Sequence, residues 1–532
     1  MNENPNKFLH NTEAPEAELI RDFNLYSDAE GRERTISTKR LAPFSELSPN
    51  FCDEEGKPLF PRAEEIIKAF SENRNTTETD SASTITRKPH LLIVGGFVRD
   101  LLLDKKPKDI DFATNLELED VKQLLNERYA EEIAAKEIYL DQTGEAFGVA
   151  RLRFRDSGEE YEIASFRQDI GVSDGRRPAS IAATKKPGID AERRDFTINA
   201  LFYNPVSGTV IDYAGGLRDI DEKKLRFVGD AKQRLAEDNL RALRYIRFLF
   251  KTGFSEDSQA ETAITESAAE TASLPPERVI DELKKTLAMA DGKYGEVVAR
   301  YAQFGLLKPL IPQLYESQQI DATNENFTAN LKEAIATLNA LPAKSSFALF
   351  LAGLLDQLPD KTEAESDKKE TAAVTVMRKL KIDTATREAA NWIISNQSLI
   401  TSLSQLSRYQ AISLISQPHF LEALDLIEAK AKASDAATDS AITHPVSPLR
   451  DLYETLTQEM NDDRAALAEI KKVLRGDTIV RLYKEIHGKQ PAGITIGKLK
   501  NEAETRCANQ RIVSIDLAEA TLRDIISEHT AD

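Results

Sequence analysis

Two aspartates one residue apart, Asp109 and Asp111, are the side chains whose type and spacing point most directly to chemistry. They lie in a segment, 109–112, that reads as a short strand. Because side chains alternate faces along a strand, both carboxylates are expected on one face, while Ile110 and Phe112 enter the core. Carboxylates held that close repel each other, and a hard cation such as Mg²⁺ removes the penalty. The pair therefore predicts a divalent-metal site.

A glycine pair, Gly95 and Gly96, precedes the aspartates. It follows an apolar run at 91–94, expected to be a buried strand, and leads into helical spacing over 97–103. Paired glycines permit a tight turn and let a phosphate approach the backbone without meeting a Cβ atom. Each feature alone is usually a plain turn or a solvated edge. In the order strand, turn, helix, strand they predict metal-assisted phosphoryl or nucleotidyl transfer.

Glu162 is the candidate for a third carboxylate near the metals. It lies in an expected strand at 160–166, on the face opposite Tyr161 and Ile163. On spacing alone, an exposed strand glutamate explains this residue nearly as well. Another half-buried strand is expected at 147–154, where apolar and polar residues alternate.

The segment 193–201 offers a second group of candidates. Asp195 could begin a helix whose first turn binds anions, and Arg194 with its neighbour Arg193 could clamp phosphates or a ribose. The alternative is a surface cluster in which Asp195 is a plain helix cap. The preceding residues, 168–192, read as a long connection, and such connections are usually functional or mobile.

From residue 231 the pattern becomes helical, and charged residues recur at helical spacing. Asp238 and Arg241 are three apart, and Glu237 and Arg244 lie within a turn or two on the same expected helix. As surface pairs they would contribute only about 0.2–0.5 kcal/mol each. This is also the locally basic part of the chain, which suits a nucleic-acid backbone; its cations are Arg226, Lys232, Arg234, Arg241, Arg244, Arg247 and Lys251.

Size and composition limit the kinds of protein to which these motifs can belong. The chain has 532 residues, which predicts two to four domains. Its net charge of -18 argues against a protein that coats nucleic acid with a generally basic surface. Cys52 and Cys507 form no disulfide framework. The sequence shows no signal peptide and no apolar run that could span a membrane, so we expect a cytoplasmic protein with no membrane partner.

Four segments are expected. Residues 1–88 read as a polar, irregular extension, with a short helix over 62–70, and residues 212–219 (DYAGGLRD) read as a turn whose glycines are architectural. The expected domains are an extension at 1–88, a head at 89–230, a helical neck that selects nucleotide and binds RNA at 231–315, and a helical body and tail at 316–532.

The ordered motifs resemble the class II nucleotidyltransferase family, which holds the CCA-adding tRNA nucleotidyltransferases and the bacterial poly(A) polymerases. The likeness spans roughly residues 90–310. Its matching segments are GGFVRDLLL at 95–103, DID at 109–111, RRDFTINAL at 193–201, DYAGGLRDI at 212–220 and EDNLRALRYIRF at 237–248. The resemblance implies an α/β nucleotidyltransferase (palm-like) head with a small mixed sheet, followed by an all-helical neck, body and tail.

The resemblance also implies roles for single residues. Asp109 and Asp111 would hold two Mg²⁺ ions, and Glu162 is kept as a catalytic candidate. The nucleotide-binding residues would be those of the triphosphate side, the ribose side and the base-reading motif: Gly95, Gly96, Arg99, Arg194, Asp195, Asn199, Asp238, Arg241 and Arg244. Cytosine and adenine both present an exocyclic amino donor beside a ring acceptor. A carboxylate and a guanidinium can read that edge and mismatch uracil and guanine.

The resemblance therefore favours addition of CCA to tRNA from CTP and ATP, with no DNA partner. Segment 144–166 lacks the basic Gly-Arg-Arg-Phe type run associated with bacterial poly(A) polymerases. A poly(A) polymerase, or an enzyme that adds only A or only CC to tRNA, stays open as the alternative. A non-catalytic RNA-binding protein is the second alternative, which the intact acidic residues oppose.

Overall fold

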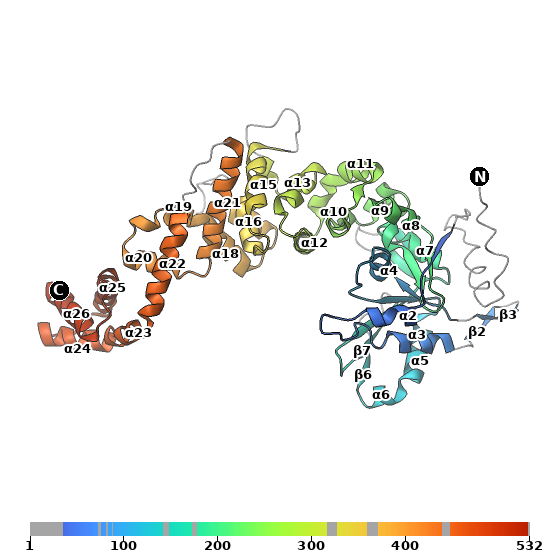
Figure 1. Cartoon of the computed structure of the whole chain (residues 1–532), viewed down its shortest axis with the longest axis horizontal. Helices are drawn as coiled ribbons and strands as arrows, with labels where there is room; N and C mark the ends of the chain where they lie inside the picture. Colours follow the sequence, from blue (N-terminus) through green and yellow to red (C-terminus); the bar gives the residue numbers. More distant parts are fainter. Residues whose placement is uncertain are drawn as a thin grey trace. The chain divides into compact units, whose positions relative to one another are not determined.

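The structure is a computed structural model, and it describes residues 36–72, 76–80, 83–87, 89–141, 148–172, 178–315, 327–358, 371–438 and 447–529. The chain divides into two compact units, one of residues 1–286 with 304–309 and one of residues 287–303 with 310–532. The large sheet belongs to the first unit (Figure 1). Residues 231–286 of the expected neck fall in the same unit as the head, and the boundaries expected at 88, 230 and 315 stay predictions.

The predicted mixed sheet is confirmed, and it has eight strands in the order β1-β12-β11-β4-β5-β8-β7-β6. Every neighbouring pair is antiparallel except β5 and β8, which run parallel. The strands are β1 (Ser37–Arg40), β4 (Leu91–Val94), β5 (Asp111–Thr114), β6 (Ile138–Asp141), β7 (Val149–Phe154), β8 (Glu160–Ser165), β11 (Leu201–Asn204) and β12 (Thr209–Asp212).

The central strand–turn–helix–strand unit is found, with one correction. Helix α4 (Gly96–Leu102) follows β4, but β5 begins only at Asp111, so Asp109 lies before the strand and not within it. The predicted alternation of faces still holds, since Ile110 and Phe112 are buried and both aspartates are exposed. Helix α5 (Leu118–Arg128) and the short α6 (Ala130–Ala134) then lead to β6.

The expectation of a long irregular connection at 168–192 is wrong for its described part. Strands β9 (Arg167–Val172) and β10 (Pro178–Ala183) pair as an antiparallel hairpin, and α7 (Pro187–Glu192) follows. The glycine, serine and proline content suggested a loop, but backbone pairing between the two strands satisfies this segment locally. Residues 173–177 lie outside the described residues.

The expectation of an irregular leader also needs correction, because the described part of residues 1–88 folds with the head. Strand β1 pairs with β12 at the sheet edge, α2 (Phe44–Leu47) and α3 (Ala63–Glu72) follow, and β2 (Thr76–Asp80) pairs with β3 (Ser83–Arg87). The short helix expected at 62–70 is thus confirmed as α3.

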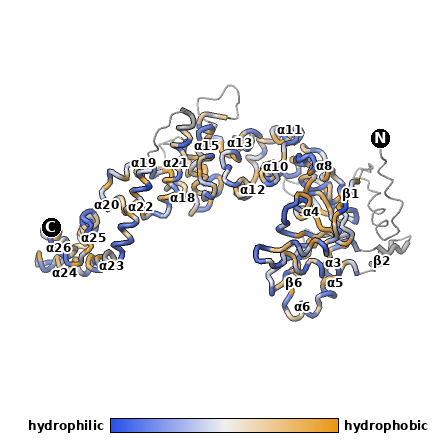
Figure 2. Tube along the Cα trace, in the orientation of Figure 1, coloured by the Kyte–Doolittle hydropathy of each residue, from blue (hydrophilic) through white to orange (hydrophobic). Residues whose placement is uncertain are grey.

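Aromatic side chains of this segment pack around α4. The ring centroids of Phe44, Phe51 and Phe60 lie 6.0, 5.5 and 5.9 Å from that of Phe97. Figure 2 shows the apolar concentration around α4. The three rings pack on Phe97 of α4, the helix that follows the glycine turn. This packing fixes the orientation of α4 and of its polar side chains.

The turn after β12 depends on a buried carboxylate and a close backbone contact. Asp212 accepts hydrogen bonds from the backbone N–H groups of Ala214, Gly215, Gly216 and Leu217, at 2.8–3.0 Å. Helix α8 (Gly216–Asp221) begins there, and a Cβ atom at Gly216 would lie 2.3 Å from the Thr197 carbonyl oxygen. The glycine is therefore architectural, as predicted.

Replacing Gly216 with alanine is expected to lower the free energy of unfolding by about 1–3 kcal/mol, because the backbone of Thr197 has to move. Gly493 provides a matched control, since it also begins a helix and has open space where a Cβ would lie. Gly493→Ala should be neutral or slightly stabilising. Urea denaturation of both variants measures the difference, and equal effects would contradict this account.

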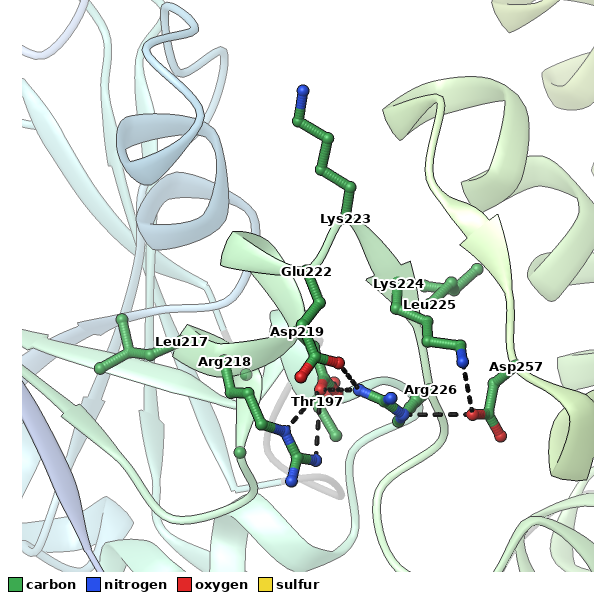
Figure 3. A network of polar contacts seen from close by, with 12 residues as sticks. Thr197, Leu217, Arg218, Asp219, Glu222, Lys223, Lys224, Leu225, Arg226 and Asp257 are labelled. Atoms are coloured by element: carbon green, nitrogen blue, oxygen red, sulfur yellow. Dashed lines mark hydrogen bonds and ion pairs between the residues drawn. The ribbon is translucent and has the colours of Figure 1, made fainter.

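Helices follow the head as predicted. The first unit contains α9 (Ala231–Glu237), α10 (Leu240–Thr252), α11 (Ser258–Ser267) and most of α12 (Pro276–Met289). Arg226 bridges the buried Asp219 of α8 and Asp257, the N-cap of α11, so these elements are tied together by charge (Figure 3). Asp219 also accepts from the Thr197 hydroxyl at 2.6 Å.

The described residues of the second unit form helices. They are α13 (Tyr294–Gln303), α15 (Ala329–Ala340), α16 (Phe347–Leu355), α17 (Ala372–Lys379), α18 (Thr384–Ser395), α19 (Gln397–Thr401), α20 (Arg408–Ile415), α21 (Phe420–Thr438), α22 (Ser447–Asp462), α23 (Arg464–Val473), α24 (Gly476–His487), α25 (Gly493–Asn509) and α26 (Ile515–Glu528). Across the described residues, no helix combines the length and apolar character that crossing a bilayer demands.

Candidate active site

Three charged side chains lie beside the backbone of the glycine turn. Gly95 has a φ of +70°, and a Cβ atom built on it would lie 3.4 Å from Arg194 Nη1. A Cβ on Gly96 would lie 3.4 Å from Asp109 Oδ1 and 3.5 Å from Arg99 Nη2. Because neither glycine has a side chain, an anion that reaches this turn would meet the backbone and two guanidinium groups.

At the centre of the sheet, two further carboxylates, Asp109 and Glu162, lie close enough to Asp111 to affect its charge. Asp111 is paired in register with Glu162 across the parallel β5–β8 pair, and Asp109 precedes it by two residues. The pKa of Asp111 is raised to about 6, first by removal of water and then by the negative charges of Asp109 and Glu162, while Arg194 opposes the shift. A bound cation would relieve the repulsion among these carboxylates, and their assignment to a metal stays a prediction.

Glu162 has a partner that its strand position did not reveal. Arg151 on the neighbouring β7 donates from Nε to Glu162 Oε1 at 2.8 Å, and its Nη2 lies 2.7 Å from the same oxygen as an ion pair. This ion pair neutralises part of the carboxylate charge facing Asp111. Within the described part of the chain, no three His, Cys, Asp or Glu side chains are arranged as a metal-binding group.

A buried aspartate that sequence reasoning missed organises the arginines of the 193–201 segment. Asp190 in α7 is fully buried and accepts hydrogen bonds from Arg193 Nε at 2.9 Å and Arg194 Nη2 at 3.0 Å. Burial alone would raise the pKa of Asp190, but the two guanidinium groups hold it below its usual range. The spacings of three and four residues were the readable signal. Asp190 thus turns Arg194 toward Gly95.

The prediction that a helix begins at Asp195 is wrong. Only a single 3₁₀ turn, Thr197–Asn199, forms there. Asp195 is nevertheless held at the site. It accepts from Asn199 Nδ2 at 3.0 Å and from Arg244 Nη2 at 2.5 Å, and the Arg244 charge holds its pKa low against the opposing effect of burial. Asn199 Oδ1 in turn accepts from Arg99 Nη1 at 2.5 Å. A hydrogen-bonded chain therefore links α4 to α10.

Arg99 is the most buried cation of the site. Its side chain is 2% exposed and forms an ion pair with Asp100 at 2.8 Å. The nitrogen that makes this ion pair is Nη2, which would lie 3.5 Å from a Cβ atom built on Gly96. An anionic group of a ligand seated on the glycine turn would therefore lie within reach of this guanidinium.

Asp238 and Arg241 were expected on one helix, and the structure corrects this. Asp238 lies between α9 and α10 in an extended conformation, and its side chain accepts from the backbone N–H of Leu240. Arg241 forms an ion pair with Glu237 at 2.6 Å and donates to the Arg193 carbonyl at 3.2 Å. Glu237 therefore contacts Arg241 as expected, whereas the Asp238 carboxylate contacts Arg278 instead.

Two family matches cover parts of the first unit and the start of the second. Residues 91–226 match the Poly A polymerase head domain, and residues 253–317 match the probable RNA and SrmB- binding site of polymerase A. The site residues of the head all lie inside the first match.

Curated relatives cover the same region. Poly(A) polymerase I of Haemophilus influenzae is 35% identical over 233 residues, 42% of this chain and 48% of that protein. The Homo sapiens protein named CCA tRNA nucleotidyltransferase 1, mitochondrial, is 41% identical over 201 residues, 37% of this chain and 43% of that protein. The chain thus matches less than half the length of either relative.

Solved structures share the fold over a longer span. The Bacillus stearothermophilus CCA-adding enzyme in complex with CTP has a TM-score of 0.58 at 22% identity, covering 88% of this chain and 98% of that one. The Thermotoga maritima CCA-adding enzyme complexed with tRNA has a TM-score of 0.58 at 18% identity, covering 92% and 99%. At these identities the likeness concerns the fold, a mixed-sheet head followed by helices.

Proposed function

We propose that this chain, whose residues 91–226 and 253–317 match two domains of polymerase A, adds C, C and A to tRNA 3′ ends. The substrates are tRNA, CTP and ATP, and no template or DNA takes part. The RNA 3′-hydroxyl oxygen, on losing its proton, bonds to the α-phosphorus of the nucleotide. The bond from that phosphorus to the bridging oxygen breaks, and pyrophosphate leaves. The convergence of three carboxylates beside the glycine turn is the observation that supports this most.

Asp109 and Asp111 are proposed to hold two Mg²⁺ ions, and their hard oxygen donors fit that metal. When bound, the ions supply charge stabilisation for the attacking and leaving oxygens. Glu162 completes the acidic set from its place opposite Asp111 on β8. The raised pKa of Asp111 supports the assignment, because a cation would stabilise the ionised form of a crowded carboxyl.

The remaining site residues are proposed to hold the nucleotide. Gly95 and Gly96 allow the triphosphate to reach the backbone, and Arg99 and Arg194 face the same space. The ribose side is proposed to consist of Asp195 and Asn199, with Arg244 fixing Asp195. Asp238 and Arg241 are proposed to read the base edge, accepting from the amino group and donating to the ring nitrogen.

The contribution of Asp111 to the stability of the metal-free protein is expected to fall as pH rises from about 4 to about 6. Over that range the folded state keeps a proton on Asp111 that the unfolded state has released, because the folded pKa of about 6 exceeds the unfolded value. Thermal melting of the wild type and of Asp111→Asn, with EDTA or with Mg²⁺, measures this. The variant should lack both the pH dependence and the Mg²⁺-induced rise in Tm. Identical curves would contradict the crowding of these carboxyls.

A poly(A) polymerase is the second candidate, favoured by the 35% identity to the Haemophilus influenzae protein. The two are separated by incubating the purified chain with tRNA transcripts that end before CCA, together with each NTP. CCA addition predicts three added nucleotides and a requirement for CTP. Long A tails, or no dependence on CTP, would overturn it, and addition of A alone or CC alone would identify a partial enzyme.

A non-catalytic RNA-binding protein would give no incorporation under any of these conditions while still binding tRNA. We place the protein in the cytoplasm in the intact cell, where tRNA and nucleoside triphosphates are both available. Imaging of the tagged chain tests that location.

A further inference from the structure

The part of the large sheet formed by β8, β7 and β6 has one covered face and one open face. The residues on the covered face are buried, and α5 packs against these strands; they include Ala150, Leu152, Phe154, Tyr161 and Ile163. The alternate residues of β8 and β7 are largely polar and reach solvent. They lie on the same side as Asp111, because Asp111 is in register with Glu162, and Glu162 with Arg151.

The open face carries a strip of charged and aromatic side chains that ends at the edge of the sheet. The Arg151 Nε atom lies 2.8 Å from Glu162 Oε1 and 3.5 Å from Glu160 Oε1. Arg153 donates to Glu160 Oε2 from Nη2 at 2.6 Å and from Nε at 3.0 Å. Tyr139 on the edge strand β6 is in register with Arg153 and is 43% exposed. The carboxylates orient both guanidinium groups, each of which has N–H donors beyond those contacts.

The direction of the proposed reaction determines what can lie on this strip. Val94 and Glu162 are in register with Asp111 on its two sides. The glycine turn directly follows Val94, so the triphosphate, with its leaving oxygen, is assigned to the β4 side of Asp111. The attacking oxygen approaches the α-phosphorus roughly opposite to the leaving oxygen. The RNA 3′ end therefore approaches from the β8 side, and the open face of β8, β7 and β6 lies along its path.

We propose that this open face is the subsite for the last two nucleotides of the RNA. Arg151 and Arg153 contact their phosphate groups, and Tyr139 stacks on the outer base. The proposal rests on the proposed function, since it takes the RNA 3′ end as the attacking group. Neighbouring strands lie about 4.8 Å apart, which places β7 roughly 10 Å and β6 roughly 14 Å from β5.

The chemistry of these side chains fits a short single-stranded RNA end. An arginine binds a phosphate group through parallel N–H groups, and an aromatic ring stacks on any base. The carboxylates of Glu160 and Glu162 weaken the phosphate contacts, because they offset the guanidinium charges. Weak contacts suit an RNA end that has to move by one nucleotide after each addition.

Substitutions of Tyr139 separate binding of the RNA end from binding of the nucleotide. In single-turnover extension of a tRNA transcript ending in CC, with ATP, Tyr139→Ala should raise the apparent Kd for RNA at least about fivefold, because stacking on one base is lost. Tyr139→Phe keeps the ring and should stay within about twofold of the wild type. By titration calorimetry without RNA, both variants should bind CTP within about twofold of the wild type.

Arg153→Gln tests the phosphate contact. It should raise the Kd for the same transcript about threefold to tenfold and reduce the slope of log affinity against log salt concentration by about 0.7. Arg153→Lys should restore part of the affinity, because the charge returns without the planar fork. Arg128→Gln is the matched control, since Arg128 forms an exposed ion pair with Glu65 at 2.8 Å and lies on α5, which packs on the covered face. It should change neither the Kd nor the slope.

Photo-crosslinking gives a readout that needs no activity and decides the matter if a variant fails to fold. A transcript whose last nucleotide is 4-thiouridine should crosslink to β6, β7 or β8 of the wild type. Crosslinks confined to other segments, or an RNA Kd that Tyr139→Ala leaves unchanged, would overturn the proposal. A loss of CTP affinity as large as the loss for RNA would also contradict it. Wild type that crosslinks on these strands but extends no RNA would disprove the proposed function alone, whereas extension with crosslinks elsewhere would disprove only the subsite.

Discussion

Replacing Asp109 and Asp111 together with alanine is expected to abolish nucleotide incorporation while leaving the fold and tRNA binding intact. The loss should be at least about 10³-fold, because the charge stabilisation assigned to these carboxylates is worth several kcal/mol. Both residues are exposed, and the pKa of Asp111 is raised to about 6, first by loss of water and then by the charges of Asp109 and Glu162, so their removal relieves an unfavourable charge. Single-turnover extension of a tRNA ending before CCA measures the first effect, and a filter-binding assay measures the second.

A surface aspartate of the same head provides the control. Asp221, the last residue of α8, is exposed, and Asp221→Ala should retain wild-type incorporation. Activity that survives the double replacement would show that the acidic site lies elsewhere. Loss of tRNA binding together with activity would mean that the two aspartates support RNA contacts or the fold rather than catalysis.

Replacing Asp190 with alanine is expected to give the largest loss of stability among the site residues. The change leaves the guanidinium groups of Arg193 and Arg194 without their buried counter-charge, and breaking such a pair costs about 3–5 kcal/mol. Incorporation should fall as well, because Arg194 then has no fixed direction toward Gly95. Urea denaturation at pH 7 measures the first effect, and nucleotide affinity measures the second.

The stabilisation by Asp190 should also depend on pH in a defined direction. Since the folded pKa lies below the unfolded one, the contribution is present above about pH 4 and is lost as pH falls through the folded pKa. Asp281→Ala, which breaks an ion pair whose carboxylate is 60% exposed, is the comparison and should cost no more than about 1 kcal/mol. Equal costs for the two variants would mean that Asp190 is not the buried anchor described above.

Local pattern was enough to predict the centre of the head. The apolar run, the glycine pair, α4 and the alternation around Ile110 were all readable, because period and turn chemistry act over a few residues. The same alternation placed Glu162 on the open face of β8, opposite Tyr161 and Ile163. It could not show which strand lies beside β8, and the parallel pairing with β5 is what brings Glu162 to Asp111.

What only the tertiary structure decided is which charged groups meet across long separations. Arg99 reaches Asn199 over 100 residues, Arg244 reaches Asp195 over 49, and Arg278 reaches Asp238 over 40. Helical spacing predicted that Asp238 and Arg241 lie on one helix. In the structure α9 ends before Asp238 and α10 begins after it, so the two residues are not on the same helix. Composition predicted a polar, irregular extension for residues 1–88, but three aromatic rings of that segment pack on Phe97. Periodicity describes one element at a time, whereas an ion pair depends on how two elements pack, so these partners required the folded chain.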